Sequence, residues 1–348
     1  MELWQQQLKE SITSPDELAR RFGLDSGETD RVAKRYPLRI TPYYLDLIRE
    51  AGDPIWRQCV PDAAELAEDE ELADPLNEEA LSPVPAIVHR YPDRVLFLVS
   101  GTCATYCRFC TRKRKVGCPS MRVSFQEVLD GIAYIAKTPG VSDVLLSGGD
   151  PLMMSDLLLE DILGRLRAIP HVEIIRIGTR MPVTLPDRIT DGLCKMLRRF
   201  APLYVNTHFN HPRELTPAAA EACRRLADAG VVLGNQTVLL RGVNDDAEVM
   251  AALFRGLLRL RVRPYYLHQM DLVRGTGHFR TKVEQGIGIL KALRGQVSGL
   301  AIPHYVIDLP GGKGKIPVLP DYVEKMGDEL LIRTGAGELV RFPNDCSG

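Results

Sequence analysis

The sequence lacks an excess of either charge and lacks any long apolar run. Its 44 Lys and Arg residues nearly balance 45 Asp and Glu residues, for a formal net charge of −1. That balance provides no global field to attract nucleic acid or an anionic membrane. No uncharged apolar stretch reaches membrane-spanning length, and residues 1–7 contain no apolar signal-peptide region. We therefore expect a cytoplasmic protein with no nucleic-acid or membrane partner.

Low-complexity tracts are also missing, and the cysteines do not suit a disulfide framework. There are eight cysteines in 348 residues, and three of them are clustered, which is more typical of a reducing compartment. The hydrophobic content of 45% is enough to bury a large core. The composition therefore predicts a globular chain whose clustered cysteines carry chemistry.

The clustered cysteines are Cys103, Cys107 and Cys110, spaced C-x3-C-x2-C after an apolar run at 94–100 that predicts a buried strand. Thiolates are the usual ligands of iron–sulfur clusters. Because a cubane cluster has four irons, three cysteines leave one iron open to a non-protein ligand. A closed zinc site is the alternative, but it needs four ligands, and the next cysteine, Cys118, lies in a Pro/Ser loop. The spacing therefore favours a 4Fe–4S cluster.

Beyond residue 84, short apolar runs alternate with segments of helical periodicity. The predicted strands are 95–100, 141–147, 172–177, 203–207, 231–236 and 263–267, and the predicted helices are 126–137, 157–169, 189–199, 217–229, 246–258 and one that starts near 283. Six strand–helix units predict an α/β fold with parallel pairing and right-handed crossovers. A partial (β/α)6 barrel would collect the strand ends into one site, whereas a doubly wound sheet is the alternative.

The flanking regions differ from this core in composition. Residues 1–83 are charged and helical in pattern, and residues 301–348 contain a glycine-rich lysine segment and an expected hairpin that turns at Gly335 to Gly337. We therefore expect an N-terminal helical region over 1–83, a core over 84–300 and a C-terminal lysine loop with a tail hairpin over 301–348.

Two glycine-rich segments stand out. Residues 147–151 read Ser-Gly-Gly-Asp-Pro, whose glycines let backbone carbonyls approach a ligand closely, although such a segment is also an ordinary turn. Residues 310–317 carry Lys313 and Lys315 without the spacing of a phosphate-binding P-loop. A lysine on a glycine loop can form the Schiff base that usually anchors pyridoxal phosphate (PLP), but two solvated lysines are the simpler interpretation of this segment alone.

In combination, residues 84 to about 323 resemble the lysine 2,3-aminomutase family, which joins radical S-adenosylmethionine (SAM) chemistry to PLP. The matching segments are His89-Arg-Tyr-Pro-Asp-Arg94, 103–114, 147–151, Asn206-Thr-His-Phe-Asn-His211, 235–245, Arg263-Pro-Tyr-Tyr-Leu-His-Gln-Met-Asp271 and Pro310-Gly-Gly-Lys-Gly-Lys315. A match of this length, in order, is far more specific than any one motif.

The resemblance implies a radical SAM partial (β/α)6 barrel with three cofactors: a 4Fe–4S cluster, SAM and PLP. The residues implied for the cluster are Cys103, Cys107 and Cys110; those for SAM are Gly148, Gly149, Asp150, His208 and Gln236; and those for PLP are Lys315, Arg90, Tyr91 and Arg94. Lys315 rather than Lys313 falls on the family's Schiff-base position. Asp246 stands where some members have a zinc-binding cysteine, so we expect no such zinc.

The family's lysine-specific members also suggest three substrate residues. Arg112 falls on the arginine that binds the substrate carboxylate, and Asp271 and Asp308 fall on two acids that hold the distal ammonium. Two half-buried acids are costly unless a cation meets them, and a lysine side chain supplies that cation. If Asp271 and Asp308 are ordinary loop acids, this argument does not hold.

The expected activity is an isomerase that moves the α-amino group of L-lysine from C2 to C3, giving β-lysine through a PLP external aldimine and a 5′-deoxyadenosyl radical. The alternatives are a related mutase that serves elongation factor P modification or acts on another amino acid, and, from a different class, an iron–sulfur electron carrier or a zinc-binding module. We expect L-lysine as substrate, a one-electron reductant such as flavodoxin or ferredoxin, and a homo-oligomer.

Overall fold

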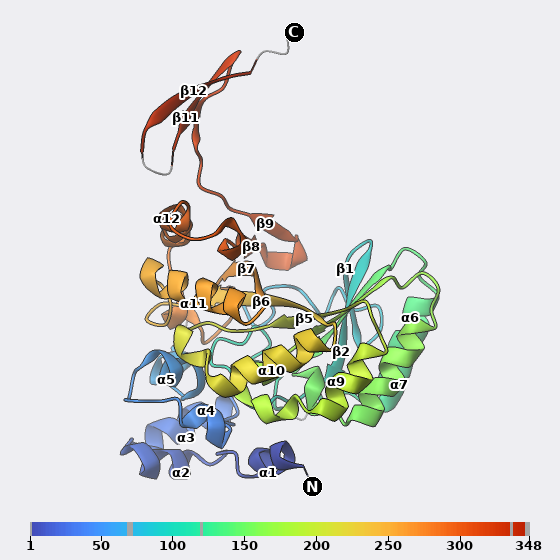
Figure 1. Ribbon diagram of the computed structural model, residues 1–348. Coiled ribbons are helices and arrows are strands. Elements are labelled where there is room, and N and C mark those ends of the chain that lie inside the picture. The colour runs from blue at the N-terminus through green and yellow to red at the C-terminus, as the bar shows by residue number, and fades with distance from the viewer. Residues whose placement is uncertain (1, 68–71, 119–120, 335–336, 345–348) are drawn as a thin grey trace.

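The chain folds around a nine-stranded sheet whose strands lie in the order β1 to β9 (Figure 1). The computed structural model describes residues 2–67, 72–118, 121–334 and 337–344. The strands are β1 Ile87–Tyr91, β2 Arg94–Ser100, β3 Asp143–Gly148, β4 Ile174–Gly178, β5 Leu203–Thr207, β6 Val232–Leu239, β7 Arg263–Gln269, β8 His304–Asp308 and β9 Lys315–Pro317. Strands β2 to β8 are parallel, whereas β1 and β9 pair antiparallel with their neighbours.

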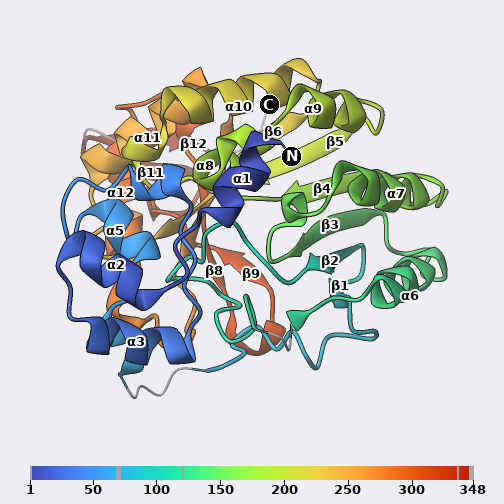
Figure 2. The ribbon, with the colours of Figure 1, turned by 90° about the horizontal axis from the view of Figure 1, so that it is seen from below.

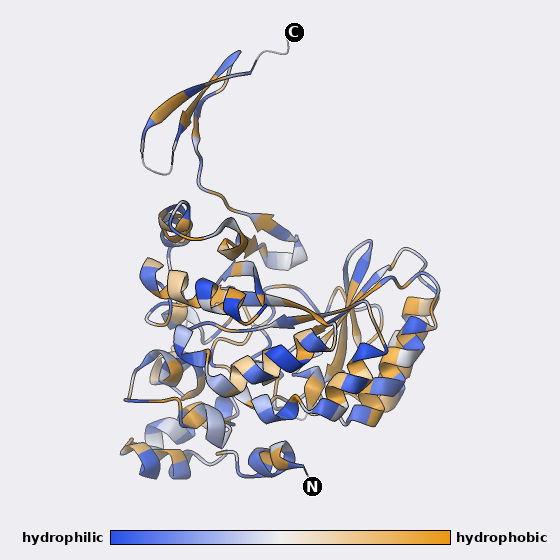
Figure 3. Cartoon of the chain, viewed as in Figure 1, coloured by the Kyte–Doolittle hydropathy of each residue, from blue (hydrophilic) through white to orange (hydrophobic). Residues whose placement is uncertain are grey.

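Helices follow the parallel strands and cover the outer face of the sheet (Figure 2). They are α6 Phe125–Ala136, α7 Asp156–Arg167, α9 Asp191–Arg198, α10 Pro217–Asp228, α11 Ala247–Arg259 and α12 Val283–Leu293, with the short α8 Met181–Thr184 after β4. Several begin with a side-chain cap. In α6, the Ser124 hydroxyl accepts a hydrogen bond from the Glu127 amide, and the Glu127 carboxylate accepts one from the Ser124 amide. In Figure 3 the helices α7, α9 and α10 carry both hydrophobic and hydrophilic residues, as helices between a core and water require.

Strand alternation divides the side chains between the core and an interior cavity. In β3, Val144 and Leu146 are fully buried, whereas Leu145 and Ser147 line the cavity. In β4, Ile175 and Ile177 are likewise buried in the core. Because successive side chains of a strand point to opposite faces, one face of the sheet packs on the helices and the other surrounds the functional site.

The six strand–helix units expected from the sequence are confirmed, and the sheet has three further strands. β8 adds a seventh parallel strand after α12, and β1 and β9 form the edges. These strands are only three to five residues long, so periodicity carries little signal, and pairing with a neighbouring strand defines them.

The sheet is curled so that its two edges meet. Tyr91 at the end of β1 accepts a hydrogen bond through its hydroxyl from the backbone amide of Lys315 in β9 at 2.9 Å. Arg90 of β1 pairs with Asp308 of β8 at 2.8 Å. These contacts join residues more than 200 positions apart and close the cavity along one side.

The N-terminal residues form five short helices, which lie together at one end of the molecule in Figures 1 and 2. They are α1 Leu3–Lys9, α2 Pro15–Phe22, α3 Ser26–Arg35, α4 Pro42–Leu45 and α5 Pro54–Cys59. Side chains from this region, including Leu18, Tyr44 and Ile55, belong to the same continuous hydrophobic core as the barrel strands. The helical region is therefore packed into the barrel core, while its boundary at residue 83 stays a prediction.

A second, three-stranded sheet projects from the core at the other end (Figure 1). It consists of β10 Val323–Lys325, β11 Glu329–Arg333 and β12 Leu339–Pro343, and β11 pairs antiparallel with both neighbours. Two residues of the expected turn, Gly335 and Ala336, lie outside the described residues. No helix in the described part of the chain has the length and apolar character needed to cross a membrane.

Candidate active site

A cavity of about 740 Å³ lies on the inner face of the curled sheet. Its volume is within the range of small-molecule sites. Every site residue expected from the sequence lines it: Arg90, Tyr91, Arg94, Cys103, Cys107, Cys110, Arg112, Gly148, Gly149, Asp150, His208, Gln236, Asp271, Asp308 and Lys315. The fold therefore brings residues from eight segments of the chain to one place, although the role of each stays a prediction.

The three cysteines lie in the loop that follows β2. The N-terminal region holds this loop through its backbone, because the Tyr106 amide donates to the Arg39 carbonyl and the Arg108 amide donates to the Gln58 carbonyl, both at 2.9 Å. All three thiols are partly buried and form no disulfide. The loop is thus anchored on residues that lie far away in the sequence.

Burial raises the pKa of two of the three thiols. Burial, with the Asp150 carboxylate and the other two cysteines, raises the pKa of Cys103 well above its usual value. Burial and Cys107 raise the pKa of Cys110 to about 11. Ionised thiolates here therefore require a positive partner, which cluster iron supplies.

The Gly148-Gly149 pair packs directly against the strand that leads into the cysteine loop. A Cβ on Gly149 would lie 2.3 Å from the Thr102 carbonyl oxygen, and one on Gly148, which has a φ of +118°, would lie 2.2 Å from the Ser100 carbonyl oxygen. The Gly149 amide donates to Ser100 at 2.6 Å, and the Asp150 amide donates to Thr102 at 2.8 Å. Glycine is therefore required at both positions because a side chain would clash with the neighbouring backbone, and it also leaves this backbone open to a ligand.

The Asp150 carboxylate joins two strand ends. Its oxygens accept hydrogen bonds from the Thr179 hydroxyl and from the amides of Arg180 and Leu152, at 2.8 to 3.0 Å. Burial raises its pKa even though these donors oppose the shift. The side chain is committed to internal bonds, so a role in binding SAM stays a prediction that rests on the backbone of this segment.

Two buried polar atoms on the next strand ends have no internal partner. Nε2 of His208 and Nδ2 of Asn206 are buried without a hydrogen-bond partner in the described structure, and both residues line the cavity with Gln236. Burial, then Arg180, lowers the pKa of His208 well below its usual value, so this imidazole is neutral. A polar ligand such as SAM would satisfy these atoms, which fits the prediction for His208 and Gln236.

Lys315 and Asp308 form the centre of the opposite, lysine-bearing part of the site. They are paired residues on the antiparallel strands β8 and β9, so their side chains lie side by side. Lys315 Nζ donates to Asp308 Oδ2, and Arg90 binds the other carboxylate oxygen at 2.8 Å. Burial opposes ionisation of Asp308, but Lys315 and its hydrogen bond bring the pKa below its usual value.

The remaining residues expected to bind PLP surround this pair. The guanidinium of Arg94 stacks on the Tyr91 ring at 3.8 Å and pairs with the side chain of Asp93. Lys315 lines the cavity, whereas Lys313 does not and is exposed. The arrangement offers one cavity lysine with two nearby arginines, which fits a cofactor that carries an aldehyde and a phosphate dianion.

Arg112 is already engaged by a carboxylate of the chain. Its Nε and Nη2 bind Glu78 at 2.9 and 2.6 Å, and its Nη1 reaches Ser147 Oγ and the Gly148 carbonyl at 3.4 and 3.3 Å. Glu78 itself is 6% exposed and lines the cavity. A substrate carboxylate would therefore compete with Glu78 for Arg112, and this role of Arg112 stays a prediction.

Asp271 is a half-buried carboxylate that accepts one hydrogen bond from a side chain. The Thr111 hydroxyl donates to its Oδ2 at 3.1 Å. Burial, together with the nearby Asp308 carboxylate, raises the pKa of Asp271 to about 7. Asp271 and Asp308 thus form an acidic pair that a cation would stabilise.

Sequence reasoning missed Glu78, Thr111, Arg180 and His268, all of which line the cavity. Arg180 follows β4, and His268 lies near the end of β7, so their position at strand ends was a usable signal. Glu78 has no such signal, because it lies outside the strand–helix units and reaches Arg112 only through the tertiary fold. Asp246, expected to replace a zinc ligand, caps α11 by accepting from the amides of Glu248 and Val249.

Comparisons with known proteins identify the family. Residues 97–254 match the model of the radical SAM superfamily, and residues 290–344 match a family model described as lysine-2,3-aminomutase. The chain is 52% identical to an L-lysine 2,3-aminomutase of Fusobacterium nucleatum, over 97% of this chain and 81% of that protein. It is 48% identical to the L-lysine 2,3-aminomutase of Clostridium subterminale, over 97% and 83%.

A relative named for a different substrate is also similar. The glutamate 2,3-aminomutase of Clostridioides difficile is 44% identical, over 97% of this chain and 82% of that protein. The family expected from the sequence motifs is confirmed: this chain belongs to the lysine 2,3-aminomutase family of the radical SAM superfamily.

Proposed function

We propose that this chain is an L-lysine 2,3-aminomutase, an isomerase that moves the amino group from C2 to C3 to form β-lysine. The observation that carries the substrate assignment is the acidic pair of Asp271 and Asp308 in the cavity. Asp308 is close enough to raise the pKa of Asp271. Asp308 is 8% exposed, and Asp271 is half-buried. Such a pair favours a ligand with a cation at its distal end.

The structure contains an internal example of that interaction. Lys315 Nζ, a primary ammonium, hydrogen-bonds Asp308 Oδ2. The side chain of a lysine substrate ends in the same chemical group, so this carboxylate could accept a hydrogen bond from the substrate ammonium as it does from Lys315 Nζ. A glutamate substrate would instead bring a third carboxylate beside Asp271 and Asp308, at a cost.

The cofactors follow from family membership. When bound, the cluster and SAM supply the radical that removes a hydrogen atom from the substrate, and PLP carries the migrating amino group. The chain's own residues position these reactants: the cysteines lie at one strand end, and Arg90 and Arg94 flank Tyr91 near Lys315. Asp308 Oδ2 accepts a hydrogen bond from Lys315 Nζ and so holds that amine in the cavity.

An anaerobic assay with lysine, glutamate and alanine tests the substrate, with β-amino acids read by mass spectrometry. We expect turnover of lysine. Asp271→Asn should lower kcat/KM for lysine by the equivalent of about 2–5 kcal/mol, the scale of a broken desolvated charge pair. Asp271 is the cleaner site because Asp308 also contacts Lys315 and Arg90.

The control for this assay is Asp161→Asn, which removes an exposed carboxylate on α7 that pairs with Arg165 far from the cavity residues. It should leave turnover unchanged. Faster turnover of glutamate than of lysine, or normal lysine kinetics in Asp271→Asn, would overturn the substrate assignment without affecting the family assignment.

The electron donor and the assembly are further parts of the proposal. A one-electron reductant such as flavodoxin or ferredoxin suits a cluster that must be reduced before each radical forms. A homo-oligomer is supported by the projecting sheet β10–β12, on which Leu339, Val340 and Phe342 are about half exposed. Sedimentation of the intact chain would measure the assembly, and a monomer at all concentrations would contradict it. Location in the cytoplasm stays a prediction.

A further inference from the structure

Arg180 is a buried charged residue of the cavity to which no role has been given so far. It lies two residues beyond β4 and is 7% exposed. Its Nη1 donates a hydrogen bond to Sγ of Cys107 at 2.8 Å. The contact connects the end of β4 with the cysteine loop after β2, and it places a permanent positive charge against a sulfur expected to bind iron.

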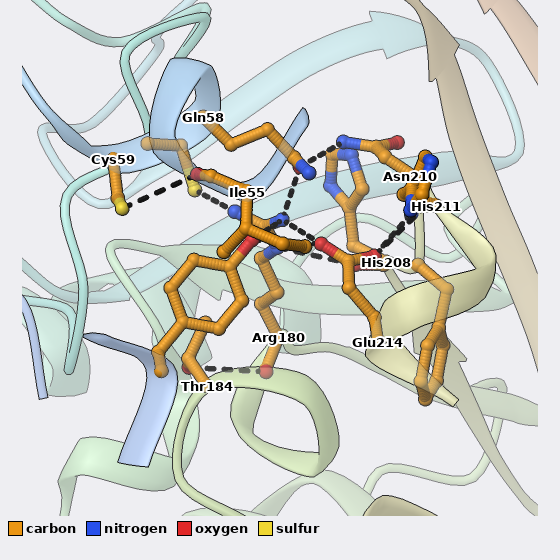
Figure 4. Close-up of polar contacts among 12 residues, drawn as sticks. Ile55, Gln58, Cys59, Arg180, Thr184, His208, Asn210, His211 and Glu214 are labelled. Carbon is orange, nitrogen blue, oxygen red and sulfur yellow. Dashed lines mark hydrogen bonds and ion pairs between the residues drawn. The ribbon is translucent and has the colours of Figure 1, made fainter. Parts of the chain in front are cut away.

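The guanidinium is held in this position from several sides (Figure 4). Its Nη2 donates to the Tyr44 hydroxyl at 3.0 Å, to Gln58 Oε1 at 2.5 Å and to Glu214 Oε1 at 2.8 Å. Its Nε donates to the His208 carbonyl at 3.2 Å. Because these partners use Nη2 and Nε, Nη1 is left directed at Cys107.

The partners of Arg180 are themselves fixed. Tyr44 donates its hydroxyl hydrogen to Glu214 Oε1 at 2.7 Å, and Gln58 Oε1 also accepts from Asn210 Nδ2 at 3.0 Å. Tyr44 and Gln58 belong to the helices α4 and α5 of the N-terminal region. The N-terminal region therefore acts on the cysteine loop through Arg180, in addition to its direct backbone contacts.

We propose that Arg180 tunes the reduction potential of the cluster through its hydrogen bond to the Cys107 sulfur. The inference rests on the proposed function, since it requires a cluster on Cys103, Cys107 and Cys110. Hydrogen bonds to the sulfurs and local net charge are among the factors that set iron–sulfur potentials, and outer partners of metal ligands tune the metal in general. Arg180 is a positioning residue, because it contacts a ligand of the cluster rather than the substrate.

The direction of the effect follows from charge. Reduction adds one negative charge to the cluster and its thiolates, and a nearby cation that donates a hydrogen bond stabilises that charge. Arg180 therefore raises the potential and makes the cluster easier to reduce. Its removal should make reduction harder by about tenfold in the ratio of reduced to oxidised cluster, which is about 59 mV for a one-electron couple.

The first experiment is a potentiometric titration of the anaerobic holoenzyme, followed by electron paramagnetic resonance. Arg180→Gln should lower the midpoint potential by this amount, and Arg180→Lys, which keeps the charge, should recover part of the shift. Arg188→Gln is the matched control, because Arg188 is also buried but bonds the Leu152 and Met154 carbonyls and the Asp156 carboxylate instead of a cysteine. The control should leave the potential of the cluster unchanged even if it destabilises the fold.

The second experiment uses the wild-type chain, so it does not depend on whether Arg180→Gln folds. Wild-type holoenzyme labelled with ¹⁵N-arginine should show, in pulsed paramagnetic resonance of the reduced cluster, a hyperfine coupling to a guanidinium nitrogen. No coupling in wild type, or unchanged potentials in folded Arg180→Gln, would overturn the inference. Failure of the wild-type chain to bind any cluster would instead overturn the proposed function.

Discussion

The cysteine end and the lysine end of the cavity both hold buried charges, but they neutralise those charges in different ways. At the cysteine end, Arg108 and Lys113 pair with Glu65 of the N-terminal region, and Glu65 is fully buried. None of these three is expected to bind a cofactor or the substrate. At the lysine end, Asp308 pairs with Lys315 and Arg90, and all three are expected to bind ligands. Glu65, Arg108 and Lys113 therefore serve the structure of the cysteine loop, whereas the ion pairs of Asp308 must be exchanged when ligands bind.

This difference shows at which end a ligand must displace existing contacts in order to bind. Glu65, Arg108 and Lys113 keep their partners, so the loop is ready to receive a cluster. Ligands at the lysine end must replace contacts such as Arg90 with Asp308, and any gain is the difference between the two sets of contacts. Substitutions at the two ends should therefore affect different measurements.

The largest effect should come from the cysteines. Changing Cys103, Cys107 or Cys110 to Ala should abolish cluster assembly and the formation of 5′-deoxyadenosine, because each thiolate binds its own iron. Iron content and visible absorbance after anaerobic reconstitution measure this. Cys118→Ala is the control and should retain the cluster; loss of the cluster in Cys118→Ala with retention in Cys103→Ala would show that the ligands are assigned incorrectly.

A second complete loss is expected at Lys315. Borohydride reduction of the PLP-loaded protein, followed by peptide mapping, should place the phosphopyridoxyl group on Lys315, and Lys315→Ala should remove the label. Lys313→Ala should keep it, because Lys313 is exposed outside the cavity. A label on Lys313 in the wild type would contradict the register of the glycine loop.

At the cysteine end, Glu65→Gln should reduce the free energy of unfolding by about 3–5 kcal/mol, because it leaves Arg108 and Lys113 buried without a countercharge. Burial opposes ionisation of Glu65, but these cations keep its pKa below the usual value. Its stabilisation is therefore present above the usual pKa of Glu and is lost as the pH falls through the lower folded value.

Denaturant unfolding measures the Glu65 effect. Glu79→Gln is the matched control, since Glu79 is 61% exposed in its pair with Lys115, and it should cost less than about 1 kcal/mol. Equal effects of the two changes would contradict the structural role assigned to the buried ion pairs of Glu65.

The smallest effect should be a pH dependence at the lysine end. Asp271 has a pKa of about 7, and an ammonium ligand binds its ionised form. Between pH 8 and pH 6 the ionised fraction should fall about tenfold, so the KM for lysine should rise by about that factor as the solution becomes more acidic. Asp271→Asn should remove this dependence, and a wild-type KM that is flat over the interval would contradict it.

The sequence alone determined the repeating core and the identity of the chemical groups. Six strand–helix units were predictable because period-2 and period-3.6 patterns arise from the local geometry of each segment. The cysteine spacing and the ordered motifs from His89 to Lys315 were sufficient for the family. Those signals lie within short stretches, so no knowledge of distant contacts was needed.

Only the tertiary structure decided which charges meet. The contacts of Arg90 with Asp308, of Arg112 with Glu78 and of Arg180 with Cys107 join residues that are 218, 34 and 73 positions apart. The hydrophobic periodicity of the sequence carries no information about these contacts, because they depend on how the sheet curls and on where the N-terminal helices pack. The raised pKa of Asp271 likewise could not be predicted from the sequence, because its burial and its proximity to Asp308 exist only in the folded chain.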